Sequence, residues 1–272
     1  MSAKVLHDGR VRLWLEPDDR GLAYGDGVFE TMLVHQGQPV WWREHWDRLM
    51  RGVSVLGLPT PDQVLVRREC ENLLVDSPRA VLKIIVTRGR GGRGYAAPAD
   101  PVPTVIVSRH EAPGPAAEPI VLRWCQTALA IQPALAGIKH LNRLEQVLAR
   151  AEWTDPQIAD GIMCDTEDRV IGATSANLFA LIGGRWLTPG LKRCGIAGTA
   201  RAWVLENVAR SAEADLSSAE VSHADALFLC NSVRGILPVR RLGLREWHGH
   251  GAIAEVQRKI AIAQPAFANQ ER

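Results

Sequence analysis

The first half of the chain alternates between strand-like and helix-like patterns of apolar positions. Residues 4–15 alternate apolar and polar side chains around Asp8-Gly9, a dipeptide typical of a two-residue hairpin turn, and predict two short strands. Further strands are predicted at residues 28–34, 39–42, 80–87 and 104–108, and helices at residues 44–56 and 62–74. This mixture is typical of an α+β fold.

A proline-rich segment separates this half from a second series of elements. Residues 111–119, EAPGPAAEP, hold three prolines and no large apolar side chain, as in an interdomain linker. After it, strands are predicted at residues 120–124, 159–164 and 177–181 and on both sides of 231–235, and helices at residues 142–153, 198–210 and 252–263. The sequence therefore predicts two α+β domains, residues 1–110 and 120–272, joined by the linker 111–119.

Composition narrows the class of protein. Apolar residues make up 46% and charged residues 23% of the chain, as in ordinary globular proteins. A formal net charge of +2 gives no reason to expect a nucleic-acid or membrane partner. The five cysteines form no CxxC pair, so neither a disulfide framework nor a cysteine-based metal site is expected. Without a signal peptide or an apolar run long enough to span a bilayer, we expect a cytoplasmic protein.

One lysine is a candidate nucleophile. Lys139 stands in LAGIKHLNRLEQ, after an apolar segment and before a predicted helix. A lysine that is shielded from water loses part of its preference for the charged form, and its neutral amine can form a Schiff base with an aldehyde. The alternative is a solvated lysine at a helix start, which is the usual environment of lysine.

The glycine-rich segment RGRGGRGY, residues 88–95, is a candidate substrate site. Arg93 could hold a carboxylate through its planar set of donors. A plain hairpin loop is one alternative, and an arginine-glycine tract for single-stranded nucleic acid is another. The nucleic-acid reading is remote, because the tract occurs once, between two predicted strands, in a chain of small net charge.

Two further segments could bind an anion. In GIAGTAR, residues 195–201, glycine and threonine open a helix whose first N–H groups would face a phosphate. Asn231-Ser232 follows the apolar run 226–230, where a hydroxyl could bind phosphate or simply close a turn. Arg48 lies on a predicted helix with an apolar opposite face and could be a solvated charge.

The order of these motifs resembles one family. DRGLAYGDGVFET, REHWDRL, RGRGGRGY, AGIKHLNRLEQ, SANLF and GIAGTAR are similar to the motifs of the fold-type IV pyridoxal-phosphate (PLP) enzymes, in the same order and over nearly the whole chain. That family includes branched-chain aminotransferases, D-amino acid aminotransferases and 4-amino-4-deoxychorismate lyases. GGRGY together with AGIKHLNRLEQ is most similar to the lyases.

The resemblance implies a cofactor, a site and an assembly. Lys139, in the C-terminal domain, matches the lysine that carries PLP as a Schiff base. The positions that match the phosphate site are Arg48, Thr199, Ala200 and Ser232. Thr31 matches a threonine near the reacting atoms, and Arg93 and Tyr95 match positions that receive the substrate carboxylate. A homodimer is implied, and no metal.

The implied reaction is that of a carbon–oxygen lyase in folate biosynthesis, which forms 4-aminobenzoate and pyruvate from 4-amino-4-deoxychorismate. One position departs from the family: Gly172 stands where a glutamate usually pairs with the pyridine nitrogen, and Glu167 and Asp168 are nearby. We hypothesise that a lyase tolerates this glycine better than an aminotransferase, because aromatisation drives the reaction; a Gly172→Glu variant that gained transamination would support this. An aminotransferase, or a PLP-binding protein without robust catalysis, stays an alternative.

Overall fold

The computed structural model describes residues 2–114 and 119–268, which divide into two compact units. The first unit comprises Met1–Pro113 and Ile138–Asn142, and the second comprises Gly114–Gly137 and Arg143–Arg272. The centre of the expected linker, residues 115–118, lies outside the described residues. The boundaries of independently folding domains stay a prediction.

The segment Ile138–Asn142 groups with the first unit, whereas the sequence assigned Lys139 to the C-terminal domain. The reason is strand pairing. The backbone N–H of Phe29 donates to the carbonyl of Lys139 at 2.9 Å, and Leu141 N–H donates to Gly27 at 2.9 Å. Five residues of the second half of the sequence therefore extend a sheet made by the first half.

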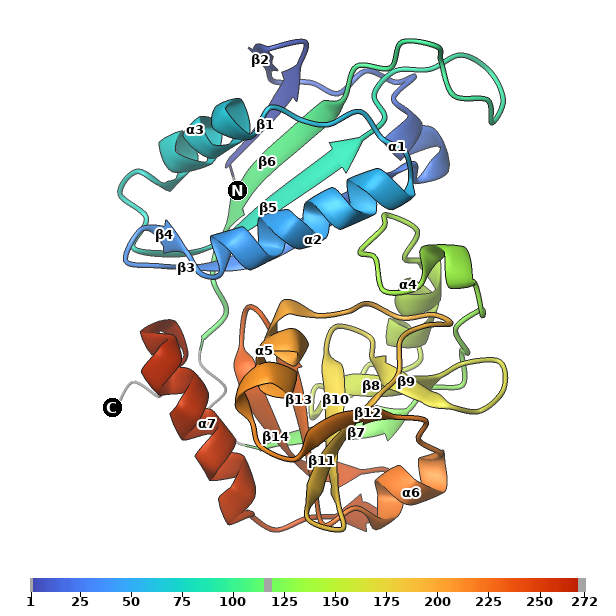
Figure 1. Ribbon diagram of the computed structural model, residues 1–272, viewed down its shortest axis with the longest axis vertical. Coiled ribbons are helices and arrows are strands. Elements are labelled where there is room, and N and C mark those ends of the chain that lie inside the picture. The colour runs from blue at the N-terminus through green and yellow to red at the C-terminus, as the bar shows by residue number, and fades with distance from the viewer. Residues whose placement is uncertain (1, 115–118, 269–272) are drawn as a thin grey trace. The chain divides into compact units, whose positions relative to one another are not determined.

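The first unit is an antiparallel sheet with two helices along it (Figure 1). In its described residues the strand order is β2-β1-β6-β5-β3-β4. The strands are β1 (Ser2–His7), β2 (Arg10–Arg12), β3 (Gly27–His35), β4 (Gln38–Pro39), β5 (Arg79–Thr87) and β6 (Thr104–His110), and the helices are α1 (Arg20–Tyr24), α2 (Trp42–Val55) and α3 (Gln63–Leu74). Positive φ angles at Asp8 and Gly9 confirm the predicted hairpin turn.

The core of the first unit explains how β3 places its side chains. Val28, Met32 and Val34 belong to one buried cluster with Leu49 of α2 and residues of α3. Because side chains alternate between the two faces of a strand, Glu30 lies on this helix-covered face and Thr31 on the opposite one. A single strand thus supplies a buried carboxylate to one face and a hydroxyl to the other.

Two predicted elements have different bounds in the structure. The strand expected at residues 39–42 ends at Pro39, because Trp41 adopts a left-handed φ of 55° and turns the chain into α2. The helix expected at residues 142–153 is α4 (Leu144–Arg150), which is shorter because the segment before it is extended. Asn142 donates through its side chain to the carbonyl of Gly25 at 3.3 Å.

The described residues of the second unit form a nine-stranded mixed sheet, with the order β12-β11-β10-β13-β14-β7-β8-β9 and β15 beside β14. The strands are β7 (Ile120–Trp124), β8 (Ile158–Cys164), β9 (Val170–Ala173), β10 (Asn177–Ile182), β11 (Arg185–Pro189), β12 (Ser211–Ala214), β13 (Ala226–Asn231), β14 (Gly235–Leu242) and β15 (Arg245–Glu246). The helices are α4, α5 (Thr199–Asn207), α6 (Ser218–His223) and α7 (Gly251–Ala263).

Strands β10 and β13 bury side chains on both faces, so they read as continuous apolar runs in the sequence. Phe179 and Phe228 stack at 5.0 Å between ring centroids, while Leu178 and Leu229 belong to the core cluster on the other face. The short elements β9, β11, β12 and α6 were not predicted. Across the described residues, no helix combines the length and apolar character that crossing a membrane requires.

Candidate functional site

Arg48 is a buried member of a charged cluster between β3 and α2. Its Nε and Nη2 donate to the two carboxylate oxygens of Glu30 at 2.7 and 2.5 Å. His45 Nδ1 donates to Glu30 Oε2 at 2.6 Å. Glu30 is only 1% exposed. The alternative that Arg48 is a solvated charge on the helix surface is therefore wrong.

The protonation states in this cluster follow from burial and pairing. Burial alone would raise the pKa of Glu30, but the charge and hydrogen bonds of Arg48 and His45 outweigh it and lower that pKa to about 2. Burial lowers the pKa of His45, so its ring is neutral and its Nδ1 carries the proton. The cluster therefore holds one negative and one positive charge in a fixed geometry.

Lys139 lies beside the opposite face of β3. Its Nζ is 4.2 Å from the centroid of the Phe29 ring. Thr31 shares this face of the strand with Phe29 and pairs in register with Lys83 of β5. Lys83 Nζ lies 5.3 Å from the same ring, so two lysines flank Phe29. Sequence reasoning missed Lys83. The feature that could have identified it is a charged residue within the apolar run of β5.

The glycine-rich segment 88–95 is a structured loop. Gly89 and Gly94 have φ angles of 85° and 83°, which side chains rarely adopt. Arg88 donates to Asp26 through Nε and Nη2 at 2.7 and 3.1 Å, and Arg90 donates to Asp18. These bonds disfavour the reading of a nucleic-acid tract, because two of its three arginines are paired with carboxylates.

The structure presents Arg93 and Tyr95 on the outside of this loop. Both side chains are exposed, and Tyr95 is 87% exposed. The ring of Tyr95 meets the ring of Tyr24 edge to face, with 5.5 Å between centroids. The described residues show no contact from Arg93 or Tyr95 to Lys139. Their substrate role stays a prediction.

In the second unit, α5 begins with the features of an anion site. Its N-cap residue, Gly198, offers no side chain to the first N–H groups of the helix. Thr199 Oγ1 is buried and has no hydrogen-bond partner among the described residues, and Ala200 is buried beside it. An orphaned hydroxyl next to uncapped helix N–H groups is suited to phosphate oxygens.

Neighbouring segments fix the loop that leads into α5. Asn177 Nδ2 donates to the carbonyl of Ile196 at 3.0 Å, and a Cβ on Gly198 would overlap the Asn177 side chain. The Gly137 N–H donates to the carbonyl of Gly195 at 2.9 Å, and the Ala197 N–H donates to the carbonyl of Gly137 at 3.0 Å. Gly137 precedes Lys139 by two residues, so the loop before α5 is tied to the start of the lysine segment.

Ser232 follows directly after β13. The turn there is closed by Asn231, whose Oδ1 accepts from the N–H groups of Val233 and Arg234 at 3.0 and 2.8 Å. The turn therefore does not need the Ser232 hydroxyl for these two bonds. The assignment of Ser232 to the phosphate site stays a prediction.

Gly172 lies within β9, opposite Met163 of β8. A Cβ on Gly172 would lie 3.1 Å from the carbonyl oxygen of Ala176, a tight contact. Glu167 belongs to the preceding turn and pairs with Arg193 at 2.5 Å. The nearby Asp168 lies in the same turn with a φ of 58°.

The buried carboxylate of Asp160 was missed by sequence reasoning. It accepts from the hydroxyls of Thr174 and Ser175 at 2.5 and 2.6 Å and from their N–H groups, so it fixes the turn between β9 and β10. The sequence signal that could have identified Asp160 is a lone acidic residue near the start of the otherwise apolar strand β8.

A separate cavity in the second unit holds about 380 Å³, and no predicted site residue lines it. Its lining residues are Trp124, Cys125, Gln126, Thr127, Ala128, Cys164, Asp165, Asp168, Ser218, Ala219 and Ser222. Burial raises the pKa of the Cys125 thiol to about 12 and that of Cys164 to about 11. Both thiols are protonated at neutral pH and are poor nucleophiles.

Comparisons with known proteins extend over most of the chain. The family model for class IV amino-transferases matches residues 27–242. An aminodeoxychorismate lyase from Vibrio harveyi is 36% identical over 236 residues, covering 84% of this chain and 87% of that protein. The crystal structure of 4-amino-4-deoxychorismate lyase from Pseudomonas aeruginosa superimposes with a TM-score of 0.89 and 42% identity, covering 96% of this chain and 99% of that one. A D-alanine aminotransferase from Staphylococcus epidermidis is 26% identical over 238 residues, covering 83% and 82%.

Proposed function

Because the chain belongs to the class IV amino-transferase family, we propose that it is a PLP-dependent lyase that converts 4-amino-4-deoxychorismate to 4-aminobenzoate and pyruvate. The observation that carries the proposal is the similarity of nearly the whole chain to the Pseudomonas aeruginosa lyase, which exceeds its similarity to the aminotransferase. The reaction would supply 4-aminobenzoate for folate synthesis.

The start of α5 in the second unit fits the phosphate of PLP. This helix start is uncapped, and the orphaned hydroxyl of Thr199 and the N–H groups of Thr199 and Ala200 can donate there. By their match to the family motifs, Arg48, which is held by Glu30, and Ser232 are assigned to phosphate binding as well. When bound, PLP supplies an aldehyde that condenses with amines and a ring that withdraws electrons from the adjoining carbon.

Lys139 is the residue to which we assign both attachment of the cofactor and proton transfer. Lys139 Nζ would hold the aldehyde carbon of bound PLP and would be freed as a neutral amine when the substrate amine takes that place. Lys139 Nζ then takes the proton from the amine-bearing ring carbon as general base. The C–O bond of the neighbouring carbon breaks, the ring becomes aromatic, and enolpyruvate leaves with the electron pair. Lys139, or Thr31 on the same face of the sheet as Phe29, returns a proton to form pyruvate.

Arg93 and Tyr95 are assigned to the carboxylate side of the substrate. Arg93 presents an exposed guanidinium, whose planar donors match a carboxylate. Tyr95 adds a ring and a hydroxyl next to it. Both residues lie on a loop shaped by glycines and by the half-buried ion pair of Arg88 with Asp26, which gives them a defined position despite their exposure.

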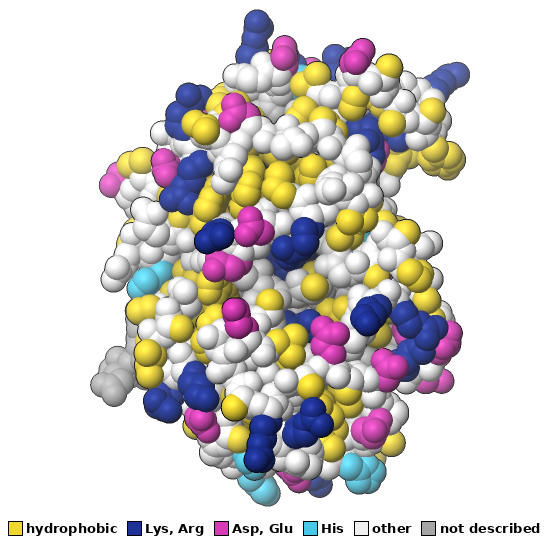
Figure 2. All heavy atoms as spheres, in the orientation of Figure 1, with side chains coloured by type: hydrophobic (Ala, Val, Ile, Leu, Met, Phe, Trp, Pro, Cys, Tyr) yellow, Lys and Arg dark blue, Asp and Glu magenta, His cyan; other side chains and the backbone are white. Residues whose placement is uncertain are grey.

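We also propose a cytoplasmic homodimer. Leu144, Val147 and Leu148 of α4 are exposed at the spacing of one helix face, and hydrophobic side chains reach the surface over α4 in the space-filling view (Figure 2). An apolar helix face of this kind is typical of an interface. All five cysteines are free, which suits a reducing compartment.

The test is an assay of purified protein with aminodeoxychorismate and no amino acceptor. We expect the wild type to release 4-aminobenzoate and pyruvate in equal amounts, Lys139→Ala to release neither, and the surface variant Lys259→Ala to match the wild type. Equal turnover by Lys139→Ala and wild type would contradict the proposal. Turnover only with an amino acid and a 2-oxo acid would replace it by an aminotransferase. Bound PLP without turnover of either kind would leave a cofactor-binding protein.

A further inference from the structure

Arg20 is a buried arginine whose three side-chain nitrogens all donate hydrogen bonds. It is 4% exposed and stands in the short helix α1, 74 to 76 residues before its partners Gly94, Tyr95 and Ala96. Its Nε donates to Asp26 Oδ2 at 2.9 Å. Its Nη1 donates to the carbonyls of Gly94 and Ala96 at 3.2 Å each, and its Nη2 donates to the carbonyl of Tyr95 at 2.9 Å.

Three successive carbonyls of one loop therefore converge on one guanidinium. This arrangement needs the planar, five-donor head of arginine, because a lysine ammonium could not span three carbonyls and a carboxylate at once. The carbonyls belong to residues 94–96, next to Arg93 and including Tyr95 itself. Arg20 thus fixes the backbone from which the two predicted substrate residues project.

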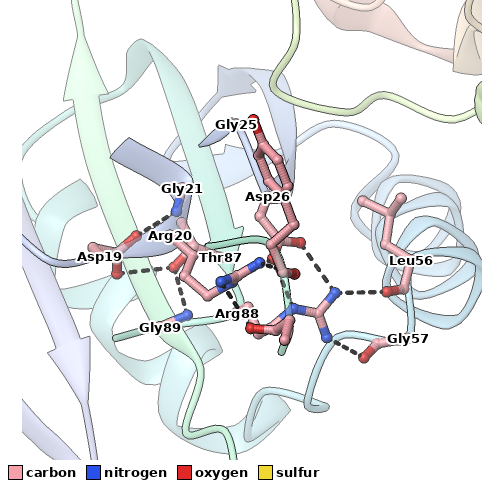
Figure 3. Close-up of polar contacts among 12 residues, drawn as sticks. Asp19, Arg20, Gly21, Gly25, Asp26, Leu56, Gly57, Thr87, Arg88 and Gly89 are labelled. Atoms are coloured by element: carbon pink, nitrogen blue, oxygen red, sulfur yellow. Dashed lines mark hydrogen bonds and ion pairs between the residues drawn. The ribbon is translucent and has the colours of Figure 1, made fainter. Parts of the chain in front are cut away.

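The surroundings of Arg20 are built to keep it in place (Figure 3). Asp26 is shared with Arg88, which also donates to the carbonyls of Leu56 and Gly57 at 2.8 and 2.6 Å. Burial alone would raise the pKa of Asp26, but Arg88 and Arg20 hold that pKa below its usual range, so the carboxylate is ionised. The guanidinium of Arg20 also lies 4.9 Å from the centroid of the Tyr24 ring.

The loop in turn leaves room for Arg20. A Cβ on Gly91 would lie 2.6 Å from Cδ and 2.8 Å from Cγ of Arg20, so glycine at this position lets the arginine pass beneath the loop. Tyr24, which flanks Arg20, also meets the Tyr95 ring. The side-chain contacts of Arg20 and the ring contact of Tyr24, both from one short helix, therefore end on residues 91–96.

We propose that Arg20 is a positioning residue for substrate specificity: by holding the carbonyls of residues 94–96 it sets the position of Arg93 and Tyr95 and thereby the affinity for the substrate carboxylate. The inference rests on the proposed function of Arg93 and Tyr95. Because its guanidinium is buried beneath the loop, Arg20 is expected to touch neither substrate nor cofactor. Its loss is expected to weaken substrate binding without removing the chemistry of Lys139.

The experiment compares Arg20→Lys, Gly91→Ala and the control Arg90→Lys in the holoenzyme. Arg20→Lys keeps a charge beside Asp26 but cannot bridge the carbonyls, and Gly91→Ala displaces Arg20 while leaving its guanidinium intact. Arg90→Lys changes the exposed arginine of the same loop. We expect the first two variants to raise KM for aminodeoxychorismate about tenfold with little change in kcat, a factor equivalent to about 1.4 kcal/mol of binding. The control should keep both constants.

Two readouts separate this role from a general loss of structure. Cleavage by trypsin after Arg93, followed by mass spectrometry, should be faster in Arg20→Lys and Gly91→Ala than in the control, because a released loop fits the protease. Bound PLP and its reaction with methylamine, an amine without a carboxylate, should stay at the wild-type level in all three.

The outcomes are distinguishable. Wild-type trypsin sensitivity and wild-type KM in both Arg20→Lys and Gly91→Ala would overturn the inference. Faster cleavage with an unchanged KM would overturn the role in specificity. Equal loss of PLP binding and methylamine reactivity in both variants would overturn it in favour of a general structural role. A wild type without lyase turnover would overturn the proposed function and with it the substrate role of Arg20.

Discussion

Two buried arginines in the first unit use their donors differently. Arg48 gives Nε and Nη2 to one carboxylate, Glu30, and both partners lie in the core between β3 and α2. Arg20 gives only Nε to a carboxylate, Asp26, and its other nitrogens to backbone carbonyls of a loop. The first arrangement fixes a positive charge in one geometry, whereas the second fixes a stretch of backbone.

The carboxylates that pair with these arginines, Glu30 and Asp26, also differ in burial and in the cause of their lowered pKa. Glu30 is almost completely removed from water and its pKa is lowered to about 2, so its ionisation depends on Arg48 and His45. Asp26 is less buried and has two arginine partners, and its pKa is lowered with no single partner carrying the effect. Burial, rather than the presence of an ion pair, is therefore expected to decide how much each pair contributes to stability.

The largest effect that sharpens this comparison is expected from Glu30→Ala. Removing one partner of a buried pair leaves the other as an uncompensated charge, which costs about 3–5 kcal/mol. We expect urea unfolding to show a loss of that size. Glu71→Ala, which removes the exposed partner of Arg67, should leave the midpoint within experimental error. A Glu30→Ala midpoint equal to that of the control would contradict the account of the buried pair.

Acid unfolding should reveal the same carboxylate. Since the folded pKa of Glu30 is about 2 and the ordinary pKa of a glutamate is 4.5, its contribution is fully present above about pH 4.5 and is lost as the pH falls through 2. The shift corresponds to about 3 kcal/mol. The free energy of unfolding, measured between pH 6 and 2, should fall more steeply for the wild type than for Glu30→Gln. Equal slopes would mean that Glu30 titrates alike in both states.

The affinity for PLP should distinguish Arg48, which we assign to the cofactor phosphate, from Arg20, which we assign to substrate specificity. Arg48→Lys keeps the charge but loses the two-nitrogen geometry, so PLP affinity should fall ten- to hundredfold, about 1.4–2.7 kcal/mol. Affinity for pyridoxal, which lacks the phosphate, should stay unchanged. Arg20→Lys should leave both affinities at the wild-type level. Absorbance titrations of apoprotein measure all three, and an equal loss for pyridoxal and PLP in Arg48→Lys would contradict the assignment of Arg48 to the phosphate.

Local pattern explains which parts of this arrangement could be read from the sequence. The β-branched and aromatic residues of β3 and the helical spacing in α2 correctly predicted both elements, and Arg48 and Lys139 stood in motifs with a family precedent. Glu30 carried a signal too, since a carboxylate in an otherwise apolar strand must find a buried cation. The identity of that cation depends on the packing of α2 on the sheet, which a one-dimensional pattern does not contain.

Long-range backbone contacts were beyond the sequence pattern. Arg20 stood in a turn-rich stretch, and nothing in the spacing indicated that it reaches residues 94–96. The segment 138–142 was assigned to the C-terminal half because no local signal shows that its extended backbone pairs with β3. Both features arise from hydrogen bonds to main-chain groups, which every residue type carries and which therefore leave little trace in composition.

The smallest expected effect concerns a third arginine–carboxylate pair, in the same loop as the contacts of Arg20. Arg90 Nε donates to both oxygens of Asp18 at 2.9 and 3.0 Å, which are normal hydrogen-bond distances. Its side chain is 54% exposed, however, and that of Asp18 is 41% exposed. Because water and salt screen an exposed pair, Arg90→Ala should leave the urea midpoint and KM unchanged, in contrast to Arg20→Lys. A drop in the Arg90→Ala midpoint as large as that of Glu30→Ala would show that pairing, and not burial, determines how much each ion pair contributes to stability.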